Sequence, residues 1–161
     1  MPVYALIDCA MDPALYPLIR AEPQQQSLFS GTLSPELIGA TPHILRLERD
    51  GPFLRALQDG GWAAGWGMIC AAGAPLAEVR RQVRRPLQAM LPDGQVALFR
   101  FYDPRVFVPF IEATSGAGLD PWFGPVTDWW APVAGRSGTT TRRYRREGAG
   151  LAWREVAGPG A

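Results

Sequence analysis

The sequence predicts an α/β fold: a single layered domain with a mixed β-sheet flanked by short helices, plus a C-terminal hairpin. Three observations carry this prediction. Apolar strand-like segments alternate with helix-like segments through the first half of the chain, which favours a sheet covered by helices. Asp93-Gly94 separates two apolar runs, the strongest short-range signal for a hairpin. At 161 residues, 47% of them apolar, the chain is long enough to bury one core.

The first strand is expected over residues 3–8 (VYALID), a short apolar run that ends in Asp8. A helix should follow from Pro13, because Asp12 can cap free N–H groups and proline fits the first helical turn. The same Ser/Asp-Pro signal for a helix start recurs at Ser34, Asp103 and Asp120. Further strands are predicted over 43–48 and 65–72, and further helices over 50–61 and 75–85. The last of these helices carries its arginines on one polar face: Arg80, Arg81, Arg84 and Arg85.

The segment LFRFYDPRVFVPF, residues 98–110, raises a question of function. Its charged pair, Asp103 and Arg105, is either a catalytic acid with an arginine clamp or part of a strand-to-helix junction. We interpret it as a junction, with a strand through Tyr102 and a helix from Pro104. Asp103 is then the N-cap of that helix, worth about 1 kcal/mol. The hairpin over 87–103 is expected to make the main sheet mixed.

After a late strand over VTDWWAPV, the composition changes, and we divide the chain into an α/β domain over 1–134 and an arginine-rich C-terminal hairpin or tail over 135–161. TTRRYRRE and LAWREV should pair as a second hairpin of modest burial. Alternation along a strand puts Trp129 and Trp130 on opposite faces, and Arg143 and Arg145 together as a stripe that faces an anion. Such arginines could equally be a solvated edge strand that prevents aggregation. The candidate partner-binding residues are Trp129, Trp130, Arg142, Arg143, Tyr144, Arg145 and Arg146.

No short motif for chemistry is present in the sequence. The single histidine, His43, is expected to pack rather than act as a base, and Cys9 and Cys70 read as small buried apolar residues. We therefore expect no catalytic residue, cofactor or metal. A net charge of +1 argues against a nucleic-acid binder. The uncharged stretch 60–77 is too weakly apolar for a membrane span, and the N-terminus lacks a basic signal-peptide region, so we expect a soluble protein.

Five blocks in collinear order resemble one family: YALIDCAMDPALYPLI, SLFSGTL, HILRLERDGPFLRALQDGGWAAGWGMI, LPDGQVALFRFYDPRVFVPF and WFGPV. They resemble the bacterial type VI secretion effector adaptors, also called Tap or Tec chaperones. The most distinctive block is carried here by Arg100, Phe101, Tyr102, Asp103, Pro104 and Arg105, with Phe99 and Val106 on either side.

The resemblance implies a non-enzymatic chaperone of the bacterial cytoplasm that binds a secreted effector protein and helps load it onto the VgrG spike protein. It also implies that partner choice lies in the variable C-terminal part of the chain. Two other readings stay open. One is a small hydrolase with a dispersed active site, and the other is a nucleic-acid-binding module that uses the arginines of residues 142–146.

Overall fold

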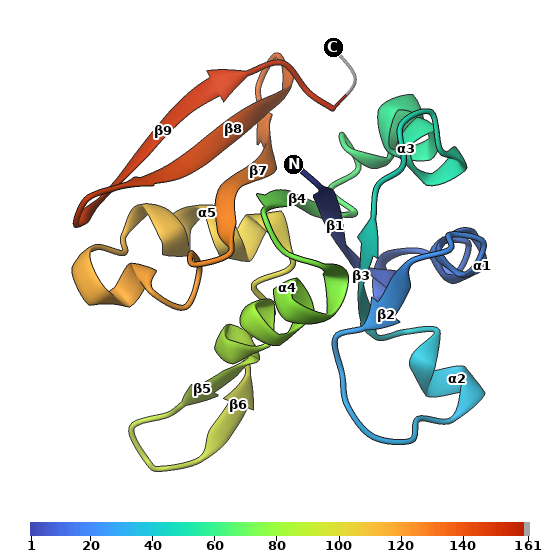
Figure 1. Ribbon diagram of the computed structural model, residues 1–161, viewed down its shortest axis with the longest axis horizontal. Helices are drawn as coiled ribbons and strands as arrows, with labels where there is room; N and C mark the ends of the chain where they lie inside the picture. Colours follow the sequence, from blue (N-terminus) through green and yellow to red (C-terminus); the bar gives the residue numbers. More distant parts are fainter. Residues whose placement is uncertain (160–161) are drawn as a thin grey trace.

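The main body is a seven-stranded sheet flanked by short helices (Figure 1). The computed structural model describes residues 1–159. The strand order is β2-β3-β1-β4-β7-β8-β9. The strands are β1 (Val3–Asp8), β2 (Gln25–Ser27), β3 (Pro42–Arg46), β4 (Gly67–Ala72), β7 (Val126–Gly135), β8 (Gly138–Glu147) and β9 (Gly150–Val156). The predicted α/β class, with one layered domain and a C-terminal hairpin, is confirmed.

The strand directions differ from the prediction. Every strand pair within residues 1–159 is antiparallel, so the main sheet is not mixed. The predicted hairpin exists, but β5 (Gln88–Met90) and β6 (Val96–Leu98) form a separate two-stranded sheet. Alternation of helices and strands does not fix direction, because a connection built from several short elements can return the chain to either end of a sheet.

The hairpin turn itself forms as predicted. Gly94 has a φ of +82°, a conformation that favours glycine, and the Asp93 side chain accepts a hydrogen bond from the N–H of Gln95. The second strand is shorter than predicted. It ends at Leu98 rather than Tyr102 because the chain turns at Arg100, whose carbonyl oxygen accepts a bond from the Asp103 N–H.

Most helix starts follow their signals. Ser34 and Asp103 each accept a hydrogen bond from the following turn, as expected. The helix after Asp12 begins only at Leu15, because the Asp12 carboxylate holds the Ala14 N–H in a turn first. Asp120 starts no helix and instead ends a short one. The helices are α1 (Leu15–Arg20), α2 (Pro35–Ile38), α3 (Pro52–Ala56), α4 (Leu76–Val83) and α5 (Pro104–Glu112), with single turns η1 (Cys9–Met11), η2 (Leu57–Gly61), η3 (Arg85–Leu87) and η4 (Gly116–Leu119).

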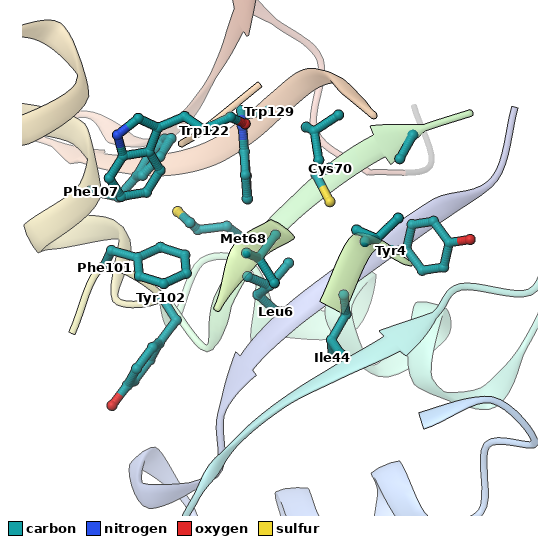
Figure 2. Packing of buried hydrophobic residues seen from close by; sticks show 14 of the residues in the cluster. Tyr4, Leu6, Ile44, Met68, Cys70, Phe101, Tyr102, Phe107, Trp122 and Trp129 are labelled. Carbon is teal, nitrogen blue, oxygen red and sulfur yellow. The ribbon is translucent and has the colours of Figure 1, made fainter. Parts of the chain in front are cut away.

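The core has two parts, one on each face of the sheet. Alternate residues of β1 divide between them, with Leu6 on one face and Ile7 on the other. The larger part lies under α4 and α5 and is rich in aromatic rings (Figure 2). Its members include Met68, Phe101, Phe107, Trp122 and Trp129. The smaller part lies under α1 and α3.

The arginine-rich C-terminal segment belongs to the main sheet. β8 pairs with β7 from Asp128↔Arg145 to Gly135↔Gly138, so the sheet continues across the predicted boundary at residue 135. Burial is modest, as predicted, because Thr141 and Tyr144 are the only buried residues among the described residues 135–159. Tyr144 is fully buried, and its ring meets that of Phe107 edge-on, with 5.7 Å between the ring centroids. The number of aliphatic residues in the segment, on which the prediction was based, does not reveal that Tyr144 lies in the core. Residues 160–161 of the predicted segment lie outside the described residues.

Candidate functional site

The Asp103–Arg105 pair is a helix cap. The Asp103 Oδ1 atom accepts the Arg105 backbone N–H at 2.9 Å and its Nε–H at 3.0 Å, and Oδ2 accepts Nη2–H at 2.7 Å. Burial alone would raise the pKa of Asp103, but these hydrogen bonds and the Arg105 charge outweigh it and lower that pKa. Both carboxylate oxygens are therefore occupied by the protein's own donors. The capping interpretation is confirmed.

Arg100 connects this motif to the first strand. Its Nη2 atom lies 2.7 Å from Asp8 Oδ2, and that hydrogen bond and the Asp8 charge raise the pKa of the guanidinium. Asp8 in turn caps η1 through the Ala10 N–H. Phe101 and Tyr102 are buried beside it, and Pro104 is buried in the first turn of α5. The polar and apolar groups of the family motif thus hold together the end of β1, the turn and the start of α5.

Cys9 and His43 are in contact in the interior of the protein. Cys9 Sγ is 3.4 Å from His43 Nδ1. The same nitrogen is 2.9 Å from the Thr41 carbonyl oxygen, which can only accept, so Nδ1 carries the proton and cannot take one from the thiol. Burial, with help from the Asp8 charge, raises the pKa of Cys9 to about 12. An activated thiol needs the opposite shift. The expectation that both residues pack in the interior is confirmed.

The four arginines of β8 are bound to carboxylates of this chain. Arg143 and Arg145 both bind Asp128 Oδ1, at 2.7 and 2.8 Å, so the anion that faces the predicted stripe is a residue of β7. Arg142 binds Glu112 at 2.8 Å and Arg146 binds Asp120. Asp128 lies directly across from Arg145, a pairing that the sequence could not reveal before the register of β7 and β8 was known.

The predicted aromatic partner residues divide between core and surface. Trp129 and Tyr144 are fully buried and present no surface to a partner. Trp130 points to the other face, as alternation predicted, and is half-buried under the Arg143 guanidinium, 5.3 Å from the ring centroid. It lines a groove of about 630 Å³ with Val3, Leu54 and Ile69. A partner-binding role for Trp130 and the β8 arginines stays a prediction.

Sequence reasoning passed over a second arginine cluster, on α4 and η3. Arg81, Arg84 and Arg85 line a groove of about 620 Å³ together with Phe29 and Leu98. The signal was available in PLAEVRRQVRR, where four arginines follow a single glutamate. The sequence predicts only a polar helix face here, because it does not show which arginines pair with a carboxylate in the folded protein.

Two absences concern residues 1–159. No helix there is long and apolar enough to cross a membrane. No three His, Cys, Asp or Glu side chains of that range are grouped so that they could hold a metal ion. The uncharged stretch 60–77 forms turns, β4 and the start of α4.

The fold and the motif define a layered α/β domain whose most distinctive segment is structural. A family model described as a domain of unknown function, DUF4123, matches residues 3–120. The match runs from β1 to the end of η4 and includes the whole FRFYDPRV segment. The chain belongs to this family. No curated protein and no solved structure matches it. Strands β7, β8 and β9 lie beyond the matched residues.

Proposed function

We propose that this chain is a cytoplasmic, non-enzymatic adaptor chaperone that binds a type VI secretion effector and helps load it onto the VgrG spike. The observation that carries the proposal is the family match over residues 3–120. That range contains four of the five sequence blocks that resemble the effector adaptors, including the distinctive segment 99–106; the fifth block, WFGPV, lies just beyond it at residues 122–126.

The geometry of the distinctive motif supports a binding protein. The Arg105 side chain donates hydrogen bonds to both carboxylate oxygens of Asp103, and Arg100 forms an ion pair with Asp8. A carboxylate that acts as a general acid or base must be within hydrogen-bond reach of its substrate, whereas both oxygens of Asp103 are already bound. The motif thus builds the fold, and partner recognition is left to surfaces outside it.

The two alternative functions have less support from the contacts. A hydrolase would need an activated nucleophile or base, and burial shifts the Cys9 thiol in the wrong direction. A nucleic-acid module built on residues 142–146 would need free positive charge for phosphates. Each arginine in that range is bound to a carboxylate of the chain.

The test is co-expression of the full chain with a candidate effector toxin and a VgrG spike protein. We expect the chain and the toxin to co-purify, and the toxin to reach VgrG only when the chain is present. The chain should leave a panel of ester and peptide substrates intact, with the Asp103→Asn variant as a matched control. Toxin that reaches VgrG equally well without the chain would contradict the adaptor role, and turnover lost in Asp103→Asn would support a hydrolase.

A further inference from the structure

Arg80, Arg81, Arg84 and Arg85, at the end of α4 and the start of η3, differ from the four arginines of β8 in having no acidic partner within residues 1–159. Within residues 1–159, seven ion pairs involve arginine: those of Arg46, Arg100, Arg105, Arg142, Arg143, Arg145 and Arg146. Arg80, Arg81, Arg84 and Arg85 form none. Arg80 is held by the carbonyl oxygens of Ser27 and Phe29, at 2.7 and 3.1 Å. Burial, followed by the charge of Arg84, lowers the pKa of Arg80, so the cluster repels itself.

The groove beside these arginines contains no carboxylate to neutralise them. Its lining holds three arginines and no Asp or Glu: Leu28, Phe29, Ser30, Leu33, Arg81, Arg84, Arg85, Leu87, Gln88 and Leu98. Arg84 Nε is buried and has no hydrogen-bond partner. A buried donor without an acceptor is costly and uncommon in folded proteins. Arg142 Nε is in the same state, so this buried atom does not by itself indicate a binding site. An acceptor on another molecule can reach the exposed side chains of Arg81 and Arg85.

An uncovered apolar face continues from this groove onto the β5–β6 hairpin. The cross-strand pairs Gln88↔Leu98 and Met90↔Val96 lie on one face of the hairpin, and Leu98 also lines the groove. Residues Met90, Val96 and Leu98 are 79%, 61% and 50% exposed. Figure 1 shows the hairpin projecting from the end of α4, away from the main sheet. A two-stranded hairpin is marginal in water unless something packs on it.

We infer that the groove and the hairpin face together form a docking surface for a partner segment that carries carboxylates beside large apolar side chains. The carboxylates would bind the guanidinium groups of Arg81, Arg84 and Arg85, which suit paired hydrogen bonds. The apolar side chains would cover Met90 and Val96. A phosphate backbone would satisfy the arginines but leave that apolar face in water, so a protein segment fits better. The secreted effector is the expected source of this segment, and that part of the inference rests on the proposed function.

The test uses labelled peptides matched in length, added to the full-length protein. One alternates Leu with Glu, and three comparison peptides pair Leu with Gln, Leu with Lys, and Ser with Glu. A thymidine oligonucleotide serves as the phosphate probe. We expect the Leu/Glu peptide to bind most tightly. Arg81→Glu/Arg85→Glu should weaken it by about tenfold or more, and Val96→Ser/Leu98→Ser should also weaken it.

The control variant, Arg55→Glu/Arg136→Glu, makes the same change in net charge at exposed sites outside the groove. It should bind the Leu/Glu peptide like the wild type, and thermal melts should show all variants folded. The inference is overturned if the Leu/Gln or Leu/Lys peptide binds equally well, if the oligonucleotide binds more tightly, or if the control loses as much affinity.

The effector assay separates this inference from the proposed function. If the groove variants still capture the toxin as well as the wild type, the docking surface is wrong while the adaptor role stands. If the Leu/Glu peptide binds at the groove but the toxin does not co-purify with the wild type, the surface stands and the proposed function fails.

Discussion

Replacing Tyr144 with alanine should destabilise the protein more than any other single substitution in the C-terminal hairpin of β8 and β9. Its ring is fully buried between α5 and the sheet, and its hydroxyl donates to Glu112 Oε1 at 2.7 Å. Large-to-small changes of buried aromatic residues cost about 3–5 kcal/mol. In a chain of this size each kcal/mol lowers the melting temperature by about 2–4 °C, so the expected loss is about 6–20 °C.

Two further variants show how much of this loss of stability comes from the Tyr144 hydroxyl and how it compares with the loss of the more exposed Trp153. Tyr144→Phe keeps the ring and loses the hydroxyl, and should cost about 1 kcal/mol, because Arg142 still donates to the same Glu112 oxygen. Trp153→Ala removes a side chain that is 46% exposed and lies 4.3 Å from the Arg142 guanidinium, and should cost about 0.5–1 kcal/mol. Urea denaturation followed by circular dichroism measures all three. If Trp153→Ala destabilises as much as Tyr144→Ala, the hairpin is not anchored through Tyr144.

Two other predictions concern buried polar groups. Asp103→Ala should cost about 1 kcal/mol in urea denaturation, whereas Asp103→Asn, which can still accept the Arg105 N–H, should be nearly neutral; equal losses would contradict the capping account. Burial lowers the pKa of His43, so the unfolded chain binds its proton more readily. The contribution of His43 to the free energy of unfolding should therefore be complete above about pH 6.5, and it should be lost as the pH is lowered from there. His43→Gln should flatten the slope between about pH 7 and 5.5, and an unchanged slope would assign it to other groups.

Local signals in the sequence determined much of the fold. Asp103 caps α5 because the residues that a cap needs are its immediate neighbours. The turn at Asp93-Gly94 forms for the same reason, since only glycine adopts its positive φ without strain. Trp129 and Trp130 face opposite sides because alternation is a property of any strand. These features depend on a few consecutive residues, so they can be read without the rest of the chain.

Only the tertiary structure decided which charges are neutralised. Asp128 and Arg145 are separated in the sequence and meet because β7 and β8 pair in one register. The arginines of β8, the most conspicuous arginine cluster in the sequence, therefore form ion pairs within the chain. The arginines of α4 look like an ordinary solvated helix face until the fold shows that no carboxylate within residues 1–159 pairs with them. Strand direction and ion pairing depend on contacts between distant residues. The composition of a segment therefore identified where arginines lie, and the register of β7 and β8 decided which of them pair with a carboxylate of the sheet.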